Sequence, residues 1–416
     1  MRSKQAPVHI IDCTLREGEQ TPGVWMTVDE KLALLDQLVQ AGVRYVDAGM
    51  PEIGADEQLF LRRATGRTLA EVGASVRLRE EAVQLALDTG CDALYLICPC
   101  SPVHRESRLK LSETALRARL QACIRLGLKA GKKVFMVAED AARTPLSSLT
   151  ALCLSALDVG ASRILYCDTV GILTPIRLCE QLQALQTCLG EEAPLGLHCH
   201  NDFGMATANT IAGIEAGIDW PTVCVNGVGE RSGSASLAEV VLACEQLLGR
   251  STGIDPLALR PLSAEVERLT GLIVSPLQPI VGHHAFRHES GIHVDGILKH
   301  ASTYEPISPE SVGAVRSLVL GKHSGRAVFR YVAAREGVSL SEAQLEQLMR
   351  WKEHVEPLQA RAQFAQVRTQ VRAWEAQGLG IQEEGIIHVI RSLMEAEAWL
   401  SHDHWMEPTS QRGEEL

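Results

Sequence analysis

Two histidines separated by one residue, His198 and His200, have the spacing in this sequence that best suits a metal ion. They end an apolar run that starts at Leu195, and side chains two positions apart in a β-strand point to the same side. A carboxylate beside them would complete a divalent-metal site that keeps coordination positions open for a substrate. The first apolar run, which starts at His9, also ends in charged residues and could supply it. An isolated histidine pair is more often unrelated to metal, so the rest of the chain has to be considered.

Charged and polar residues stand directly after apolar runs along the first 250 residues. If those runs are parallel strands of one barrel, their carboxyl ends share one face, where such barrels carry catalytic groups. The alternative is a solvated rim, which does not require so many charges directly behind buried runs. We therefore expect a site built from several of these residues. They are Arg16, Glu17, Asp47, Arg77, Glu139, Asp140, Asp168, Thr169, His198, His200, Asn226, Glu230 and Arg231.

A repeated plan between residues 8 and 248 would position these side chains. A short apolar strand, a polar turn and an amphipathic helix alternate, and several helices end on a glycine. Eight such units predict an α/β fold of the (β/α)8, or TIM barrel, type. A doubly wound open sheet is the competing fold, but no Gly-x-Gly-x-x-Gly turn follows the first strand. The expected strands begin at His9, Tyr45, Ala74, Ala93, Lys133, Arg163, Leu195 and Thr222. The clearest helical patterns span 28–41, 80–89, 116–130, 146–159, 175–189, 205–216 and 237–248.

The plan changes after residue 250, where prolines and glycines interrupt the periodicity. The histidine-rich segment 283–296 has little strand or helix periodicity, so we expect a functional loop with short helices. The stretch 339–374 is predicted to be helical, and the tail after about residue 376 receives no function. We expect a catalytic barrel at 1–255, a linker subdomain with a catalytic loop at 256–335, and a mostly helical C-terminal region at 336–416.

Composition narrows the partners and the compartment. The chain of 416 residues carries a formal net charge of −11, which argues against nucleic acid or an anionic membrane as a partner. An anionic small molecule remains compatible with it. No apolar stretch suits a membrane span or a signal region, so we expect a cytoplasmic protein. The 12 cysteines are scattered like buried apolar residues in a reducing compartment, and Cys98 and Cys100 are interpreted as packing residues.

Six motifs stand in order along the chain, namely Asp12 to Gln20, His198 to Asp202, Gly227 to Gly233, His288 to Gly296, Thr303 to Pro306 and Gly321 to Gly325. Together they resemble the acetyl-CoA-dependent enzymes that condense 2-oxo acids, which comprise the homocitrate, isopropylmalate and citramalate synthases. The resemblance covers residues 8 to 350 and is strongest to the short homocitrate synthases that serve nitrogenase cofactor assembly. It implies a Claisen condensation between acetyl-CoA and a 2-oxo acid.

The resemblance also implies a divalent metal, Mg, Mn, Zn or Fe, held by Glu17, His198 and His200, with acetyl-CoA as the co-substrate. Many family members have an asparagine ligand where this chain has Ser234, and an aspartate where it has Glu17. A glutamate combined with a non-ligating residue is similar to the lysine-pathway homocitrate synthases. Ser234 therefore receives no ligand role.

Catalytic roles follow from the same resemblance. Arg16 would neutralise the ketone oxygen as it becomes an alkoxide, and Thr169 would bind the C1 carboxylate. His293 would deprotonate the thioester methyl, and Glu139 and Tyr304 would assist proton transfer and thioester hydrolysis. In the family the loop with His293 and Tyr304 reaches the barrel of a neighbouring subunit. This implies a domain-swapped homodimer.

The identity of the 2-oxo acid substrate is expected to depend on two further arginines. Arg143 suits a second carboxylate or the orientation of Glu139. Arg79 stands near the place of a histidine that meets the distal carboxylate in lysine-pathway homocitrate synthases, so Arg79 is the expected partner of that group. We expect 2-oxoglutarate as the substrate and homocitrate as the product.

The alternative is a related 2-alkylmalate-type synthase that forms isopropylmalate, citramalate, benzylmalate or a phosphonate analogue. A metal-dependent lyase and an inactive paralogue with a binding role are two further alternatives. The segment from His288 to Tyr304 resembles the synthases, which disfavours the lyase. The intact set of site residues counts against an inactive protein.

Overall fold

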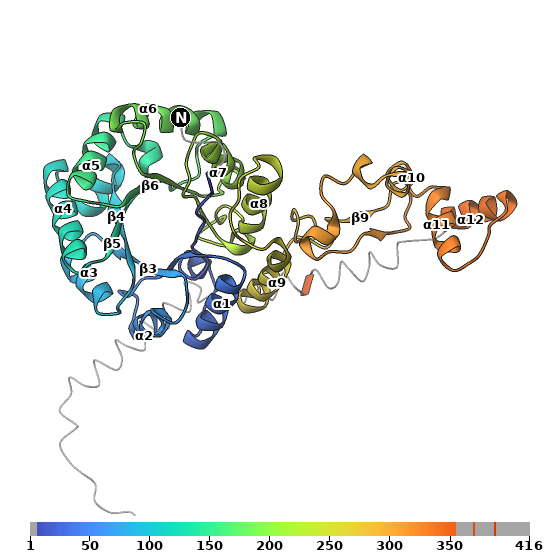
Figure 1. The fold of residues 1–416 in the computed structure, drawn as a ribbon, viewed down its shortest axis with the longest axis horizontal. Helices are drawn as coiled ribbons and strands as arrows, with labels where there is room; N and C mark the ends of the chain where they lie inside the picture. The colour runs from blue at the N-terminus through green and yellow to red at the C-terminus, as the bar shows by residue number, and fades with distance from the viewer. Residues whose placement is uncertain (1–5, 355–368, 371–386, 388–416) are drawn as a thin grey trace, which may run out of the picture. The chain divides into compact units, whose positions relative to one another are not determined.

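The computed structural model describes residues 6–354, 369–370 and 387, and its first part is a barrel (Figure 1). Eight parallel strands follow the order β7-β6-β5-β4-β3-β2-β1-β8. A parallel bridge between Leu197 and Pro221 joins the two edge strands, so the sheet closes on itself. The predicted TIM barrel is confirmed, and the open sheet is excluded. The strands are β1 (Ile11–Asp12), β2 (Tyr45–Gly49), β3 (Glu71–Arg77), β4 (Ala93–Pro99), β5 (Lys133–Glu139), β6 (Arg163–Asp168), β7 (Leu195–Cys199) and β8 (Thr222–Val223).

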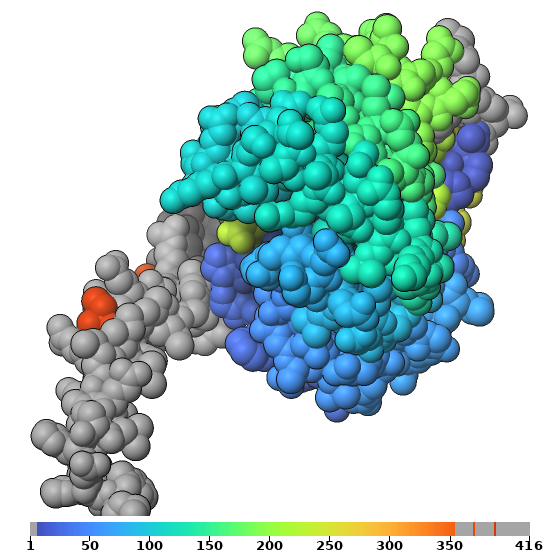
Figure 2. Space-filling model, turned by 90° about the vertical axis from the view of Figure 1, so that its left-hand side faces the viewer, coloured from blue at the N-terminus to red at the C-terminus, as the bar shows by residue number. Residues whose placement is uncertain are grey.

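Helices alternate with these strands and surround the barrel (Figure 1). In the space-filling view the face turned to the viewer is formed mainly by the light-blue to green part of the chain (Figure 2). Local chemistry sets the first turns of the helices. The Thr27 hydroxyl accepts a hydrogen bond from the Glu30 amide in a capping box, and Pro175 opens a later helix after Thr174. The helices are α1 (Val28–Gln40), α2 (Ala55–Ala64), α3 (Glu80–Leu87), α4 (Glu113–Lys129), α5 (Leu146–Asp158), α6 (Pro175–Leu189), α7 (Ala206–Glu215) and α8 (Leu237–Leu242).

Two helices differ from the sequence expectation. The helix α2 is absent from the predicted patterns because its buried residues, Phe60, Leu61 and Ala64, all lie in its second half. A pattern confined to so few residues gives little helical periodicity. The predicted helix 237–248 is α-helical only to Leu242 and continues as a π-helical turn, Ala243–Leu247.

Inward-facing aromatic side chains fill the amino-terminal end of the barrel. The ring of Trp220, just before β8, stacks on His9 with centroids 4.6 Å apart and lies 4.4 Å from the ring of Tyr45. Phe135 packs 6.2 Å away, and the Arg163 guanidinium lies 4.2 Å from the Trp220 ring. Aromatic surface and a cation–π contact therefore close this end of the barrel.

The chain after the barrel contains short elements. α9 (Leu259–Thr270) follows the barrel, and β9 (Arg287–His288) pairs in parallel with β10 (Ser317–Leu318). The predicted functional loop at 283–296 contains β9 and the start of α10 (Gly291–Lys299). α11 (Arg326–Arg335) and α12 (Glu342–His354) follow.

Part of the C-terminal region predicted from the sequence lies outside the residues that the structure describes. Of the predicted helical stretch 339–374, α12 covers the first part, and most of the remainder lies outside the described residues. Nearly all of the tail after residue 376 lies outside them too. In the described part of the chain no helix is long and apolar enough to span a membrane.

Candidate active site

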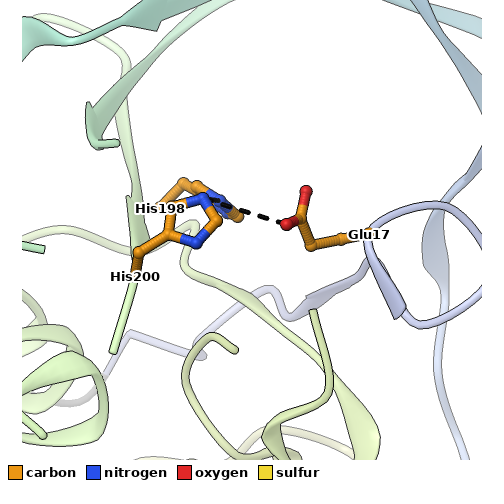
Figure 3. A group of neighbouring side chains, drawn as sticks. All are labelled: Glu17, His198 and His200. Carbon is orange, nitrogen blue, oxygen red and sulfur yellow. Dashed lines mark hydrogen bonds and ion pairs between the residues drawn. The ribbon is translucent and has the colours of Figure 1, made fainter. Parts of the chain in front are cut away.

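Three side chains with metal-binding groups meet at the carboxyl end of the barrel strands (Figure 3). His198 and His200 come from β7 and its following residue, and Glu17 comes from the loop after β1. One ligand atom from each residue lies within 4.8 Å of the others, and all three residues are buried. The Nε2 atoms of the histidines are 3.1 Å apart, and His200 Nε2 is 3.9 Å from Glu17 Oε1. The fold thus brings together the three residues expected to be ligands.

The protonation states of these groups suit a cation. Burial, and then the neighbouring His200, lower the pKa of His198 to about 3, and burial also lowers the pKa of His200. Burial alone would raise the pKa of Glu17, but Arg16 and the histidines outweigh it and bring that pKa to about 2. At neutral pH the site therefore has two uncharged imidazoles and one carboxylate, which are the forms that bind metal.

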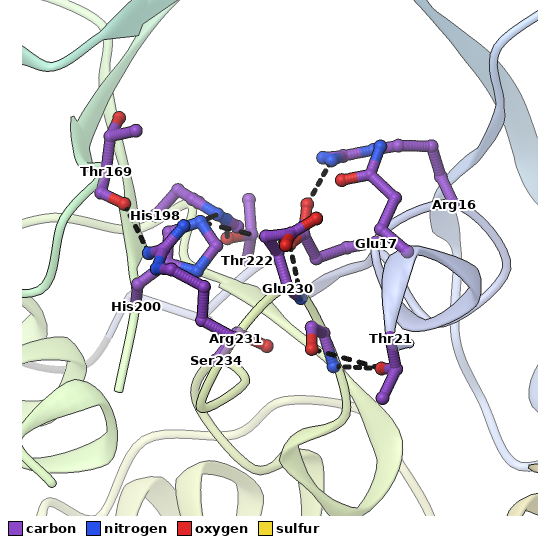
Figure 4. Close-up of polar contacts among 12 residues, drawn as sticks. Arg16, Glu17, Thr21, Thr169, His198, His200, Thr222, Glu230, Arg231 and Ser234 are labelled. Carbon is purple, nitrogen blue, oxygen red and sulfur yellow. Dashed lines mark hydrogen bonds and ion pairs between the residues drawn. The ribbon is translucent and has the colours of Figure 1, made fainter. Parts of the chain in front are cut away.

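Neighbouring groups orient the two imidazoles. The Thr222 hydroxyl lies 2.6 Å from His198 Nδ1, so the Nε2 side of the ring turns toward the other two residues (Figure 4). His200 Nδ1 is buried and has no hydrogen-bond partner among the described residues. The nitrogens that converge with the Glu17 carboxylate are the two Nε2 atoms, and this mixed nitrogen and oxygen donor set fits a divalent cation.

Arg16 fixes a positive charge beside the three residues. Its guanidinium donates to the Glu17 carboxylate and, from Nε, to Asp47 Oδ2 at 2.8 Å. The Ser75 hydroxyl donates to the same Asp47 oxygen at 2.9 Å. Burial raises the pKa of Asp47 even though Arg16 opposes the shift. A guanidinium held by two carboxylates has little freedom to move, so it forms a preorganised donor for an oxygen in the pocket.

The loop after β8 supports the site from a second side. The Glu230 amide donates to Glu17 Oε1 at 3.1 Å, and the Thr21 hydroxyl bonds to the amide and the carbonyl of Gly229. Gly233 has a φ of +85°, and a Cβ there would lie 2.0 Å from the Gly227 carbonyl oxygen. Only glycine allows this turn.

Ser234 belongs to the same loop. Its backbone bridges to His200, and its hydroxyl donates to the Val228 carbonyl at 3.4 Å. The side chain is thus engaged within the loop.

These residues line a pocket of about 320 Å³ that opens at the carboxyl end of the strands. The fold places six of the ten candidate site residues in its wall, namely Arg16, Glu17, Glu139, Thr169, His198 and His200. Apolar side chains, among them Met50, Ile97, Val137 and Leu165, also line it. The pocket wall therefore combines charged and apolar side chains.

Glu139 and Thr169 are held in the pocket by different partners. The Thr169 hydroxyl accepts from the Asp140 amide at 2.8 Å, so its own proton can be donated into the pocket. Glu139 forms a two-point ion pair with Arg108, whose Nη1 lies 3.1 Å from Oε1, and His104 Nδ1 is 3.4 Å from the same oxygen. Arg108 and His104 come from a π-helical segment, Val103–Leu109, after β4.

Two predicted arginines do not line this pocket. Arg143 donates to the neighbouring Asp140 at 2.8 Å instead of meeting Glu139. Arg79 is the N-cap residue of α3, and its exposed side chain pairs with Glu52. Because β3 ends at Arg77 and Arg79 lies beyond it at the start of α3, Arg77 lines the pocket in place of Arg79.

His293 and Tyr304 are brought together outside this pocket. Their rings stack with centroids 3.9 Å apart, and Tyr304 is 41% exposed. A Cβ on Gly296 would lie 2.8 Å from the Tyr304 ring, so the glycine permits the close approach. Neither residue lines the barrel pocket in the described part of the chain.

Sequence reasoning gave no site role to Arg108 or Tyr95. Arg108 lies on a segment without α-helical periodicity, so no pattern links it to Glu139. Tyr95 occupies an apolar strand that also suits a purely structural tyrosine. The one available indication was strand alternation, which puts Tyr95 on the same side of β4 as Ile97, and both residues line the pocket.

Comparisons with known proteins agree with this architecture. The HMGL-like family model matches residues 7–266, and a model described as homocitrate synthase post-HMGL domain-like matches 280–357. A putative (R)-citramalate synthase from Methanopyrus kandleri is 42% identical over 82% of this chain and 68% of its own length. A 2-isopropylmalate synthase from Sulfolobus acidocaldarius is 37% identical over 82% of this chain and 89% of its own. The crystal structure of an HMG-CoA lyase from Bacillus subtilis, at 20% identity, covers 65% of this chain and 96% of its own with a TM-score of 0.60, a likeness of fold alone.

Proposed function

The chain belongs to the HMGL-like family, among the acetyl-CoA-dependent synthases that condense 2-oxo acids, and we propose that it forms a 2-alkylmalate-type product. The citramalate and isopropylmalate synthases among its relatives favour this product class over homocitrate. The observation that carries the proposal is the position of Arg16 beside Glu17, His198 and His200 in one pocket.

The chemistry needs an electrophilic ketone and a carbanion equivalent. The thioester methyl loses a proton and bonds to the ketone carbon, and the former ketone oxygen gains a proton. Water then cleaves the thioester and releases CoA. A divalent cation at Glu17, His198 and His200 would supply Lewis-acid polarisation and a chelation point for the 2-oxo acid.

Residues of the chain position the substrate for these steps. The Arg16 guanidinium, held by Glu17 and Asp47, would stabilise the ketone oxygen as negative charge develops there. The Thr169 hydroxyl would donate to the C1 carboxylate because its acceptor site is already used by the Asp140 amide. Glu139, held by Arg108, would assist proton transfer at the pocket wall.

We assign the proton-abstracting base to His293, paired with Tyr304, of a second copy of the chain. The stacked pair lies outside the pocket of its own barrel, and an exposed pair of this kind is available to another subunit. This makes a domain-swapped homodimer part of the proposal. Mixing inactive His293→Ala and inactive Glu17→Ala proteins should then restore about a quarter of the wild-type activity, because half of the dimers are mixed and each has one intact site. A mixture that stays inactive while forming mixed dimers would contradict the swap.

The apolar side chains in the pocket wall favour a small alkyl side chain on the 2-oxo acid. Met50, Ile97, Val137 and Leu165 line it, so pyruvate and 2-oxoisovalerate are the expected substrates. Apolar walls discriminate strongly against a charged group that would lose its hydration there.

A second candidate is 2-oxoglutarate, with homocitrate as the product, and one observation favours it. Arg77 lines the pocket, and its guanidinium has no ion pair among the described residues. The buried Tyr95 hydroxyl also lacks a hydrogen-bond partner there. These groups could meet a distal carboxylate, so we move the role first expected for Arg79 to Arg77. Arg143, paired with Asp140, would act by fixing the loop after Glu139.

The deciding experiment is CoA release from acetyl-CoA by the purified protein with Mn²⁺ or Mg²⁺, tested with pyruvate, 2-oxoisovalerate, 2-oxoglutarate, phenylpyruvate and oxaloacetate. We expect metal-dependent release, abolished by EDTA, that is fastest with pyruvate or 2-oxoisovalerate. Fastest release with 2-oxoglutarate would select homocitrate synthesis. No release with any acid would contradict the proposed function.

A matched pair of variants separates the two candidates. If 2-oxoglutarate is the substrate, Arg77→Met should raise its KM about tenfold or more and leave the KM for pyruvate unchanged, because only the dicarboxylic acid loses an ion pair. Arg79→Met, on the outer side of the same turn, is the control and should alter neither KM.

A further inference from the structure

Lys31 of α1 is almost inaccessible, with a relative exposure of 2%. Its ammonium group lies 2.7 Å from Glu19 Oε2, and 2.9 and 2.8 Å from the two carboxylate oxygens of Glu57. It also lies 4.8 Å from the centre of the Phe60 ring. Fully buried lysines are rare unless paired, and this one is paired twice.

Lys31, Glu19 and Glu57 together form the Lys31 triad. Each of its two carboxylates also accepts a hydrogen bond from a backbone amide. Glu19 accepts from the amide of Met26 at 3.0 Å, and Glu57 accepts from the amide of Met50 at 3.2 Å. A Cβ on Gly49 would lie 1.8 Å from Glu57 Oε1, so the carboxylate lies directly against the end of β2. The triad therefore joins two loops at the carboxyl end of the barrel.

Both loops contribute to the pocket. The first loop carries Glu17, and two residues later Glu19 binds Lys31. Gln20 of that loop and Met50 of the second loop both line the pocket, and Gln20 Nε2 contacts the Met50 sulfur at 3.9 Å. A shift at Lys31 would therefore move a candidate metal ligand and part of the pocket wall together.

Stability alone does not explain the triad. Removing charges from water costs about as much as a buried ion pair returns, and apolar replacements of similar volume are often neutral or stabilising. Here one ammonium faces two carboxylates, so the buried group also has an excess negative charge. In some proteins such groups are retained because they specify one arrangement of the surrounding chain.

We propose that Lys31 is a positioning residue of the active site, which fixes the loop of Glu17 and Gln20 against Met50 through Glu19 and Glu57. This inference rests on the proposed metal site, because its consequence is measured there. The prediction is that the triad can be removed with little loss of stability, but with weaker cation binding and a displaced pocket wall.

The test uses the full chain and Mn²⁺ alone as the probe. A neutral triple variant, Glu19→Gln, Lys31→Met and Glu57→Gln, keeps the side-chain volumes and leaves no buried charge unpaired. We expect its Kd for Mn²⁺, measured by electron paramagnetic resonance of the free ion, to rise about tenfold, which is typical of lost support around ligands. The KM for the 2-oxo acid should rise more than kcat falls, and Tm should not drop.

A matched control lies at the other end of the barrel. Arg250, also buried, donates to Asp219 at 2.7 Å and to the carbonyl of Ala6 at 2.8 Å, away from the pocket. The double variant Arg250→Met with Asp219→Asn should lower Tm, because the carbonyls of Ala6, Pro7 and Ile214 lose their donor. It should leave the Mn²⁺ affinity within about twofold, because Arg250 does not line the pocket.

The outcomes separate the two proposals. If the wild-type protein and His198→Ala bind Mn²⁺ equally, the metal site of the proposed function fails. If the wild type binds Mn²⁺ more tightly than His198→Ala does but the folded triple variant matches the wild type, the role of Lys31 is overturned. The single variant Lys31→Met leaves two carboxylates without their cation and serves as the destabilised reference. If the positive charge is what matters, Lys31→Arg should bind Mn²⁺ more tightly than Lys31→Met does, with an affinity near that of the wild type.

Discussion

At the amino-terminal end of the barrel strands the inward-facing side chains are largely aromatic, whereas at the carboxyl end they are largely charged. His9, Tyr45, Phe135 and Trp220 pack against one another at the first end. At the second end a pocket is surrounded by Arg16, Asp47, Glu139 and the three candidate metal ligands, Glu17, His198 and His200. Two strands contribute to both sets, β2 with Tyr45 and Asp47 and β5 with Phe135 and Glu139, because inward positions recur every second residue.

The comparison shows how one framework separates stability from chemistry. The aromatic end removes apolar surface from water, which stabilises the fold. The charged end leaves Asp12 Oδ2, Asp47 Oδ1 and His200 Nδ1 buried without hydrogen-bond partners among the described residues. Unpaired buried polar atoms cost free energy, so the site is maintained by the packing around it. Substitutions at the aromatic end should therefore lower stability with little effect on activity, and substitutions at the charged end should lower activity with little effect on stability.

The sharpest test compares two inward-facing histidines of the same barrel. His198→Ala should lower kcat/KM about a thousandfold or more, since the ligand set for Lewis-acid chemistry is lost. His9→Ala, which removes the stacking on Trp220, should leave kcat/KM within about twofold and lower the free energy of unfolding by about 1 kcal/mol. Steady-state kinetics and urea unfolding measure both. Equal catalytic losses would remove the distinction between the ends.

Trp220 should carry the largest stability effect at the aromatic end. Trp220→Ala removes the ring that contacts His9, Tyr45 and Arg163, so the free energy of unfolding should fall by about 3 kcal/mol. The activity of the protein that remains folded should be unchanged. Trp25→Ala, at a position that is 81% exposed, is the control and should change neither quantity. A Trp220 variant that is stable but inactive would contradict this division.

Asp12 tests the cost of charge at the catalytic end. Burial raises its pKa to about 7, so the folded chain binds more protons than the unfolded chain between pH 4 and 7. The contribution of Asp12 to stability should therefore fall as pH rises, by about 2 kcal/mol between pH 5 and pH 7, whereas buried His198 and His200 contribute with the opposite sign. In Asp12→Asn the contribution of this carboxyl group should be lost, while the amide oxygen can still accept from the Thr14 amide. Urea unfolding at several pH values measures it, and identical pH profiles would contradict the assignment.

Substitution of Arg108 should give the smallest effect on activity, and it tests whether the active site extends to this residue. Arg108→Met releases Glu139 from its ion pair, so kcat should fall about tenfold with little change in unfolding free energy, because the arginine is half exposed. Arg117→Met is the control, since Arg117 pairs with Glu113 on the outer helix α4. If both variants retain full kcat, Glu139 does not need to be held in place.

The fold and the centre of the site could be predicted from the sequence because their signals are periodic or local. Strand alternation placed His198 and His200 on one face, and the resemblance to 2-oxo acid synthases added Glu17 and is confirmed at the level of the family. The helix α2 was missed because its buried residues fall in one half.

The rim of the pocket was harder to predict because it depends on exact registers and long-range pairs. The substrate role was expected for Arg79, but β3 ends at Arg77 and Arg79 already caps α3. Arg143 was a candidate partner of Glu139, yet a turn of the chain gives it Asp140, and Arg108 reaches Glu139 from another loop. The roles of His293 and Tyr304 depend on a second subunit and stay predictions.

The distribution of cysteines affects how turnover can be followed. All 12 are free thiols: ten are buried, Cys179 is half-buried and Cys188 is exposed. Burial raises the pKa of Cys123 to about 12 and that of Cys91 and Cys244 to about 11, so few thiolates are present to react. A chromogenic disulfide reagent should therefore titrate one fast thiol per native chain, at Cys188 on α6. The colour that develops afterwards would report the CoA liberated by catalysis, without a cysteine-free variant.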